Sequence, residues 1–214
     1  MAIRVARLRF TQIEVNHLSL VDGFCTVDQV RLLHDLVASL PDGSRIVEAG
    51  VWQGRTAIAM ALACRGTNKK VYAIDPWRDY SEEGHTVDDW LKAQGLVSLE
   101  RAYQLFLRNR RRFRVEPWLE VIRAPSLEAA KAWSHGPIAL AFIDGNHEAD
   151  AVRADIDAWM ERLTPDGTLL GDDLPIGGVS EAISRYLQEH YPHVSLATPD
   201  GRTWQLMRTP KSAE

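Results

Sequence analysis

Short apolar runs alternate with longer helical patterns along most of this chain. The apolar runs lie at residues 46–49, 71–75, 119–123, 138–143 and 168–170. Between most of them, apolar residues recur at three- and four-residue intervals, which is the spacing of one helix face. The helical patterns lie at residues 26–40, 57–64, 126–133, 148–163 and 179–190. This alternation predicts an α/β fold with a doubly wound, mostly parallel sheet.

The alternation changes near the C-terminal end. Residues 194–198 and 203–207 flank the turn sequence Pro199-Asp200-Gly201, which predicts an antiparallel hairpin. With these two strands, we expect a seven-stranded, Rossmann-like sheet in a single domain over residues 1–214.

Two segments lie outside the simple alternation. We expect residues 1–44 to form an N-terminal helical segment. Residues 76–85 are a polar, aromatic loop, and a long helix is predicted over 87–112 with Gly95 as its weak point. We therefore expect residues 76–117 to be a lid or a substrate-binding insertion.

Composition and charge exclude some classes of function. A chain of 214 residues with 45% hydrophobic and 25% charged residues is typical of one globular domain. The net charge of −4 gives no broad electrostatic case for nucleic acid or an anionic membrane. The sequence has neither a signal-peptide pattern nor an apolar run long enough to span a membrane. Cys25 and Cys64 indicate a reducing compartment, so we expect a cytoplasmic protein.

A glycine loop, Gly50-Val51-Trp52-Gln53-Gly54, follows the first strand. One glycine suits a tight turn and the other suits close packing of the next helix. The spacing is not the G-x-G-x-x-G of dinucleotide loops, and Trp52 and Gln53 put bulk where a pyrophosphate would approach the backbone. The loop suits a ligand with an adenosine and no phosphates, such as S-adenosylmethionine. The alternative is a glycine turn in another kind of α/β unit.

Acidic residues end several of the predicted strands. Asp75 stands where dinucleotide folds place the acid that accepts the ribose hydroxyls, although a turn-capping Asp before Pro76 is the alternative. Asp144 ends the fourth strand, and Asp172 and Asp173 follow the fifth. Because the carboxyl ends of parallel strands face one crevice, these three carboxylates should lie close together and repel one another.

A hard divalent ion, Mg²⁺ above all, would relieve this repulsion. Adjacent strand residues point to opposite faces, so Asp172 and Asp173 can share one ion only if the strand has already broken into a loop. The alternative is that these acids cap the following helices. His147 lies at the start of the next predicted helix, where a neutral imidazole suits a general base near pH 7. Packing, capping and metal binding remain alternatives for His147.

Together, these residues resemble the class I S-adenosylmethionine-dependent methyltransferases. The closest resemblance is to the small metal-dependent sugar O-methyltransferases of the macrocin type and the cephalosporin-hydroxylase-like group. It is carried by VEAGVWQGRT, VYAIDPW, FIDGNHEADAVRADIDAW and LTPDGTLLGDD, and the pairing of IDGNH with GDD is its more specific part. Related catechol-type enzymes have a Lys where this chain has His147, and members of this size include enzymes that O-methylate methylmannose polysaccharides.

The resemblance implies an O-methyltransferase that uses S-adenosylmethionine and Mg²⁺ on a hydroxyl of a sugar or another small molecule or oligosaccharide. It implies Asp144 and His147 as catalytic residues, His147 being the general base, and Mg²⁺ held by Asp144, Asp172 and Asp173. The cofactor residues that it implies are Glu48, Gly50, Gly54 and Thr56 near the methionine part, Asp75 at the ribose and Ser126 near the adenine. The segment around Ser126, APSLE, departs from the family's G-D-S-x-E pattern at two positions.

Other functions compete with this one. An NAD-dependent oxidoreductase would need the middle glycine that the loop lacks. A non-catalytic module for an adenosyl ligand would not need the Asp and His residues, and a metal-dependent hydrolase would leave the glycine loop and Asp75 unexplained. We expect no nucleic-acid or membrane partner. Residues 1–25 lie outside the α/β pattern and are expected to pack against a second subunit in a homodimer.

Two further groups of residues have two interpretations each. A basic cluster complements the dipole at a helix C-terminus, or binds an acidic substrate or nucleic acid; it comprises Arg108, Arg110, Arg111, Arg112 and Arg114. An aromatic group stacks on a sugar face, or buries the lid against the core; it comprises Trp77, Tyr80 and Trp90.

Overall fold

Seven strands form one mixed sheet in the computed structural model, which describes residues 11–78 and 87–209. The strands are β1 (Arg45–Ala49), β2 (Lys70–Ile74), β3 (Leu119–Ile122), β4 (Ile138–Ile143), β5 (Leu163–Gly171), β6 (Val194–Ala197) and β7 (Trp204–Arg208). They follow the order β3-β2-β1-β4-β5-β7-β6 across the sheet. Strands β1 to β5 pair in parallel, whereas β7 pairs antiparallel with both β5 and β6. The predicted fold class is confirmed.

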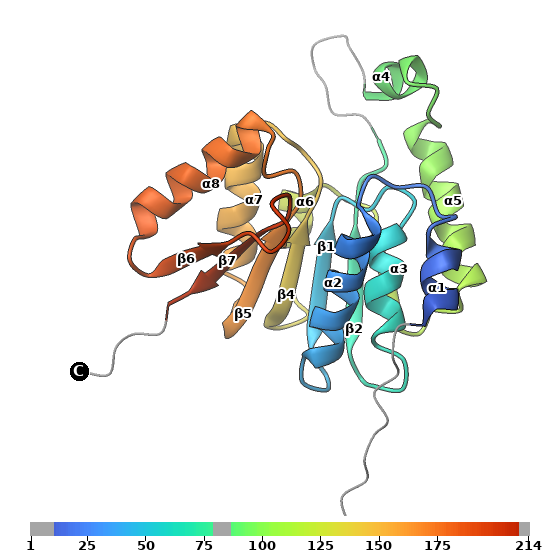
Figure 1. Ribbon diagram of the computed structural model, residues 1–214, viewed down its shortest axis with the longest axis horizontal. Coiled ribbons are helices and arrows are strands. Elements are labelled where there is room, and N and C mark those ends of the chain that lie inside the picture. Colours follow the sequence, from blue (N-terminus) through green and yellow to red (C-terminus); the bar gives the residue numbers. More distant parts are fainter. Residues whose placement is uncertain (1–10, 79–86, 210–214) are drawn as a thin grey trace, which may run out of the picture.

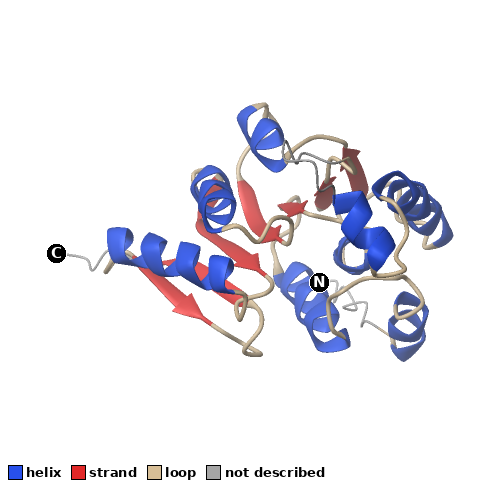
Figure 2. Ribbon diagram, turned by 90° about the horizontal axis from the view of Figure 1, so that it is seen from above, coloured by secondary structure: helices blue, strands red, loops and turns tan. Residues whose placement is uncertain are grey.

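Helices cover both faces of this sheet, as Figure 1 shows. They are α1 (Gln12–Leu18), α2 (Val27–Ser39), α3 (Arg55–Leu62), α4 (Val87–Ala93), α5 (Leu99–Arg112), α6 (Ser126–Lys131), α7 (Ala149–Met160) and α8 (Gly177–His190). Seen from above, the twisted sheet runs between the two helical layers (Figure 2). No helix within the described ranges is both long and apolar enough to cross a membrane.

The core divides into two clusters, one on each face of the sheet. Ile46 belongs to the cluster that includes residues of α2, α3 and α5, whereas the next residue, Val47, belongs to the cluster that includes residues of α6, α7 and α8. Successive residues of a strand point to opposite faces, so a strand buried on both sides must be apolar throughout. This explains the continuous apolar run of β4, which is almost wholly buried.

The order of the strands reverses between β1 and β4, which are parallel neighbours at the centre of the sheet. The register pairs Ala49, the last residue of β1, with Ile143, the last residue of β4. The glycine loop and Asp144 therefore leave the sheet side by side. In open α/β sheets, ligands bind outside the carboxyl ends of the strands at such a switch point.

The N-terminal segment contains two helices, each with a capping box. Thr26 and Gln29 cap α2, at the start of the helical pattern predicted over residues 26–40, and Thr11 and Glu14 cap α1 in the same way. Helix α1 was not predicted separately, although the spacing of Thr11 and Glu14 is the same signal. Residues 1–10 of the expected dimer-forming segment lie outside the described residues.

The single long helix expected over residues 87–112 is wrong, because the chain forms α4 and α5 instead. Gly95 adopts φ +71° and ends the first helix, and the Ser98 side chain accepts a hydrogen bond from the Arg101 N–H and starts the second. Helix α5 then packs into the core through Ala102 and Phe106.

The C-terminal hairpin is confirmed, and it brings its turn to the site. Gly171, the last residue of β5, pairs with Trp204, the first residue of β7. Because the strands are antiparallel, the residues just before β7 lie beside those just after β5. This register places Arg202 next to Asp172 and Asp173.

Candidate active site

The glycine loop fits tightly against the end of β4. Gly50 adopts φ +91°, and a Cβ built on it would lie 2.0 Å from the backbone oxygen of Asp144. Gly54 adopts φ +86° at the N-cap of α3, and a Cβ there would lie 2.4 Å from the ring of Phe106. The positive φ of Gly50 fits the predicted tight turn, and the close approach of the Asp144 backbone is a second reason for a glycine there. Gly54 is required by helix packing, as the sequence predicts.

A segment that we name the strap, residues 21–29, crosses the loop. Asp22 accepts hydrogen bonds from the side chains of Trp52, at 3.4 Å, and Gln53, at 3.1 Å. Arg55 donates to two backbone carbonyls of the strap, at 2.7 Å and 2.9 Å. The two bulky residues between the glycines thus hold the strap against the site.

Asp75 lies at the end of β2 and is surrounded by backbone donors. Its Oδ2 accepts hydrogen bonds from the N–H groups of Val51, at 2.8 Å, and Trp52, at 3.1 Å, and its Oδ1 accepts one from Trp77, at 2.7 Å. Burial raises the pKa of Asp75, and the backbone hydrogen bonds oppose that rise. The carboxylate therefore fixes the glycine loop in addition to any role toward a ligand.

Glu48 and Thr56 form a buried pair between β1 and α3. The Thr56 hydroxyl donates to Glu48 Oε1, and both side chains are buried. Glu48 Oε2 is buried and has no hydrogen-bond partner among the described residues. Burial raises the pKa of Glu48 well above its usual value, and the Thr56 hydrogen bond opposes this. An unsatisfied buried oxygen of this kind is costly, and a bound donor would remove the cost.

Ser126 begins α6 and its side chain contacts α7. Its Oγ accepts a hydrogen bond of 2.9 Å from Trp159 Nε1, and it also interacts with the buried carboxylate of Asp155. Burial raises the pKa of Asp155 to about 6, although the hydrogen bond from Ser126 lowers it. The described contacts of the Ser126 side chain are therefore with the core.

Asp172 and Asp173 leave β5 where the strand has broken. Strand β5 ends at Gly171, and Asp173 adopts φ +60°, a left-handed conformation. The condition that the sequence sets for these two acids is therefore met, because they no longer alternate across a sheet. Their side chains differ in exposure: that of Asp172 is 1% exposed and that of Asp173 is 15% exposed.

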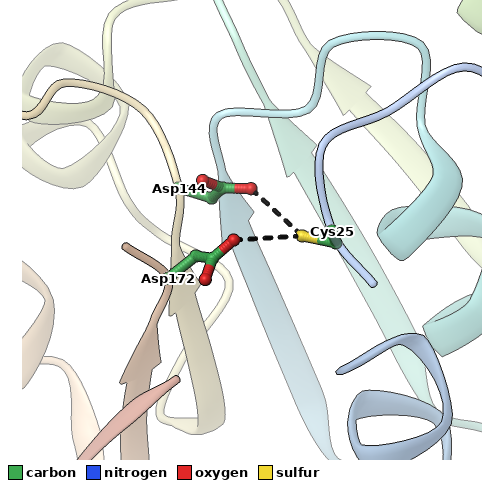
Figure 3. Close-up of side chains that lie close together, drawn as sticks. All are labelled: Cys25, Asp144 and Asp172. Carbon is green, nitrogen blue, oxygen red and sulfur yellow. Dashed lines mark hydrogen bonds between the residues drawn. The ribbon is translucent and has the colours of Figure 1, made fainter. Parts of the chain in front are cut away.

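Asp144 and Asp172 share a contact with the strap, drawn in Figure 3. The Cys25 Sγ lies 3.5 Å from Asp144 Oδ2 and 3.6 Å from Asp172 Oδ2, so its one proton can be donated to either. Burial raises the pKa of the Cys25 thiol, and the two carboxylates raise it further, so the thiol remains protonated. Gln29 Nε2 also donates to Asp172, to Oδ1 at 2.6 Å.

Arg202 joins the two acids that follow β5. Its Nε donates to Asp172 Oδ1 at 2.9 Å, and its Nη2 donates to Asp173 Oδ1 at 2.6 Å. The other oxygen of Asp173, Oδ2, lies 2.9 Å from His147 Nε2. The carboxylates thus face a guanidinium, an imidazole and a thiol.

Two groups of side chains that share Asp144 have ligand atoms close enough to hold a metal ion. Ligand atoms of Asp144, His147 and Asp173 lie within 4.8 Å of one another, and so do those of Cys25, Asp144 and Asp172. Burial raises the pKa of Asp144 well above its usual value, and the negative charges of Asp172 and Asp173 raise it further. Oxygen atoms that repel one another at this distance suit a hard divalent cation.

Sequence reasoning missed three polar side chains of this cluster: Cys25, Gln29 and Arg202. Gln29 also forms the capping box of α2, which is the role that its spacing from Thr26 indicates. Arg202 could have been found by pairing the predicted hairpin with β5, because that register puts it beside the two acids. No sequence signal places Cys25, since it reaches the cluster through the tertiary path of the strap.

The aromatic group and the basic cluster that the sequence singles out are not part of the acidic cluster where the structure describes them. Trp77 is 1% exposed and stacks on Phe106, so its indole belongs to the core. Tyr80 and the side chain of Trp90 lie outside what the structure describes. The arginines of the basic cluster lie at or just beyond the C-terminal half of α5, the position that complements a helix dipole.

Cavities do not by themselves identify the site. A cavity of about 10 Å³ lies beside the cluster, between Asp144, His147 and Trp204. A larger one, of about 320 Å³, lies along α6 and is lined by Trp133 and His135. The functional assignment therefore rests on the chemistry of the side chains.

Comparisons with known proteins give an independent result. Residues 47–174 match the family described as Methyltransferase domain. Among solved structures, the chain is similar to the O-methyltransferase NovP, with a TM-score of 0.68 and 16% identity over 86% of this chain and 80% of that one. It is also similar to an O-methyltransferase from Bacillus cereus in complex with SAH, with a TM-score of 0.61 and 15% identity over 92% and 88% of the two chains. A SAM-dependent O-methyltransferase from Thermotoga maritima gives a TM-score of 0.65 and 14% identity over 95% and 73%. These structural likenesses concern the fold.

Proposed function

Because this chain belongs to the methyltransferase domain family, which it matches over residues 47–174, we propose that it transfers a methyl group from S-adenosylmethionine to a hydroxyl group. The acceptor that we propose is a sugar or a sugar-containing small molecule. The observation that carries the proposal is the position of Asp144 beside Gly50 of the glycine loop, with ligand atoms close to those of Asp172 on one side and of His147 and Asp173 on the other. The O-methyltransferase names of the structural neighbours support the same reaction class.

The residues around the loop fit an adenosyl amino acid. The unpartnered, buried Glu48 Oε2 offers an acceptor for the ammonium group of the methionine part. Asp75 lies at the end of β2, where the fold places a ribose, and it already orders the loop backbone. The bulk of Trp52 and Gln53 excludes a pyrophosphate. The Bacillus cereus enzyme was solved in complex with SAH, which is consistent with this cofactor class.

The acidic cluster fits a hard divalent ion. Asp144, Asp172 and Asp173 would hold Mg²⁺, since Asp144 has ligand atoms near those of Asp172 in one group and of Asp173 in another, and the charges of both raise its pKa. When bound, the ion would supply a Lewis acid that lowers the pKa of a coordinated hydroxyl and fixes its position.

His147 is the proposed general base. Its Nε2 lies against Asp173 Oδ2. In the tautomer that carries its proton on Nε2, the N–H donates a hydrogen bond to this carboxylate, and Nδ1 has the free lone pair. Nδ1 then takes the proton of the acceptor hydroxyl, while the hydroxyl oxygen forms its bond to the methyl carbon. The carbon–sulfur bond breaks in the same displacement, and its electron pair neutralises the sulfonium. Asp173 acts here as a positioning residue for the imidazole.

We also propose that the protein works in the cytoplasm as a homodimer. The buried, free cysteines Cys25 and Cys64 support the first part, because they suit a reducing compartment. The second part rests on the N-terminal segment, whose helix α1 precedes the alternating strands and helices in the chain and is exposed at residues such as Ile13. Sedimentation of the full chain tests it directly.

A calorimetric titration with S-adenosylhomocysteine, together with a transfer assay, tests the proposal. We expect micromolar binding of the homocysteine compound, no binding of NAD⁺, and transfer of labelled methyl groups to sugar hydroxyls. Transfer should stop with a chelator and return with Mg²⁺. Failure to bind the cofactor product would overturn the cofactor assignment. Full activity in chelator would overturn the metal, and binding without transfer to a broad acceptor panel would favour the non-catalytic alternative.

A further inference from the structure

Arg202 occupies a position that the proposed reaction does not explain. Its guanidinium bridges Asp172 and Asp173 through two different nitrogens, at 2.9 Å and 2.6 Å. It binds Oδ1 of each carboxylate, whereas Asp172 Oδ2 accepts from the Cys25 thiol and Asp173 Oδ2 lies against His147 Nε2. A planar guanidinium suits this bridging of two carboxylates better than an ammonium.

The surrounding chain holds Arg202 in this position. Asp200 Oδ1 accepts a hydrogen bond of 2.9 Å from the Arg202 N–H, and the Arg202 carbonyl accepts one of 2.9 Å from the Leu174 N–H. Gln29 Nε2 donates both to Asp172 Oδ1 and to Thr203 Oγ1, which ties the hairpin to the cluster. The arginine backbone is therefore fixed on both sides, whereas its side chain is 38% exposed and can be hydrated if it moves.

We propose that Arg202 is a built-in counter-cation of the acidic cluster, which neutralises the cluster when no metal is bound and opposes the binding of a divalent ion. This inference rests on the proposed metal site. It assigns to the hairpin turn a control over metal affinity, so that the ion binds reversibly and the protein stays folded without it.

Elementary electrostatics gives the direction of the effect. Asp172 is buried, and without the guanidinium its charge would face two other carboxylates with only Gln29 and a thiol as donors. A divalent ion that binds the remaining oxygens would lie within a few ångströms of the guanidinium. A unit positive charge that near weakens binding of a divalent cation by roughly 10- to 100-fold in a half-exposed site. Removing the charge of Arg202 should therefore strengthen metal binding and weaken the metal-free fold.

The test compares Mn²⁺ and Mg²⁺ binding to the wild-type protein and to Arg202→Gln, by calorimetry and by the electron paramagnetic resonance signal of free Mn²⁺. Thermal unfolding is followed in chelator and in excess Mg²⁺. Arg202→Lys keeps the charge without the bridging geometry. Arg185→Gln is the matched control, because Arg185 of α8 also pairs with two acids, Glu181 of the same helix and Asp150 of α7, and lies outside the acidic cluster.

We expect Arg202→Gln to bind Mn²⁺ about tenfold more tightly or better, and to unfold at a lower temperature in chelator but near the wild-type temperature in Mg²⁺. Arg202→Lys should bind the ion nearly as weakly as the wild type, and Arg185→Gln should change neither quantity. Unchanged or weaker Mn²⁺ binding by Arg202→Gln would overturn the inference, as would tight binding by Arg202→Lys if the glutamine variant does not fold.

The same measurements separate this inference from the proposed function. A wild-type protein that transfers methyl groups in chelator contradicts the proposed metal dependence. If Arg202→Gln then gains a Mn²⁺ site that the wild type lacks, the arginine still acts as the counter-cation. Conversely, metal-dependent transfer with equal affinity in both proteins supports the proposed function and contradicts the role of Arg202.

Discussion

The two ends of the candidate site hold their carboxylates in opposite ways. At the cofactor end, Asp75 accepts hydrogen bonds from three backbone N–H groups that lie within a few residues of the strand ends. At the acidic end, Asp144, Asp172 and Asp173 face side chains from the strap, the start of α7 and the C-terminal hairpin. Backbone donors are fixed by the fold, whereas side-chain partners can be exchanged for a ligand.

This difference bears on function. A carboxylate that orders a loop with backbone bonds makes a rigid platform, which suits recognition of a cofactor. A cluster that combines mutually repelling carboxylates with the half-exposed guanidinium of Arg202 suits reversible binding of an ion. The proposed chemistry therefore separates into a rigid end that binds the methyl donor and an adjustable end that activates the acceptor.

The largest expected effect is a loss of turnover on substitution of His147, which belongs to the acidic end. His147→Ala removes the proposed base and should lower kcat by about 10²–10⁴-fold. It should leave the binding of S-adenosylhomocysteine unchanged, because Asp173, which the imidazole contacts, belongs to the acidic end. Steady-state kinetics and calorimetry measure the two quantities. His17→Ala, at an exposed position of α1, is the control, and near-normal turnover of the His147 variant would mean that the residue is structural.

The second prediction concerns Gly50, where the two ends touch. Gly50→Ala should destabilise the fold by about 3–5 kcal/mol, because its Cβ would overlap the Asp144 backbone and its φ is positive. Gly43→Ala is the matched control, since Gly43 also has a positive φ but has open space around the new Cβ, and it should cost only about 1 kcal/mol. Urea unfolding of both variants measures the difference. Equal costs would show that the two loops are not tightly packed against each other.

The third prediction applies one substitution to both ends. Asp75→Asn replaces an acceptor with a donor that faces backbone N–H groups, so it should destabilise the protein by about 1–3 kcal/mol. Asp144→Asn removes a buried charge that two other carboxylates repel, so it should stabilise the metal-free protein by about 1 kcal/mol while weakening metal binding. Melting temperatures in chelator should thus move in opposite directions. A shift of the same sign in both variants would contradict the comparison.

The cofactor end was predictable because its determinants are local. A strand followed by Gly50 and Gly54 indicates a turn and a helix, and both glycines prove to be required by contacts with Asp144 and Phe106. The sequence does not predict that Asp75 accepts hydrogen bonds from the loop backbone, because these bonds depend on the register between β1 and β2. Local signals gave the parts, and pairing of the strands decided their contacts.

The acidic end was predictable only in part. The positions of Asp144, Asp172 and Asp173 follow from strand ends, and the break of β5 after Gly171 follows the expectation. Cys25 is 119 residues from Asp144 along the chain, and its approach depends on the strap. Arg202 is 30 residues from Asp172, and its approach depends on the β5–β7 register. The helix over 87–112 failed for a local reason: a positive φ at Gly95 and the Ser98 cap together outweighed the helical periodicity.

The smallest expected effect concerns Asp155, which has neither the backbone donors of Asp75 nor the guanidinium of the acidic end. Its Oδ1 has no partner among the described residues, and Ser126 is the one hydrogen-bonding group that lowers its pKa. Burial raises that pKa from 3.8 to about 6, so the folded protein holds the proton more tightly than the unfolded chain. Its contribution to stability is therefore fully present below about pH 4, falls as the pH rises to about 6, and is constant above that.

Asp155→Asn should remove this fall. The full shift corresponds to roughly 3 kcal/mol, and we expect a gain of about 1 kcal/mol at pH 7 because the amide also changes the contact with Ser126. Urea unfolding of both proteins between pH 4 and pH 8 measures the difference, with the exposed Asp166→Asn as control. A difference that does not change over this range would mean that Asp155 is ionised in the folded state with a partner of its own. A difference that grows with pH would instead mean that a bound proton neutralises Asp155 in the folded protein. Asp75 is stabilised differently, by hydrogen bonds from backbone amides, and the acidic cluster by the charge of Arg202.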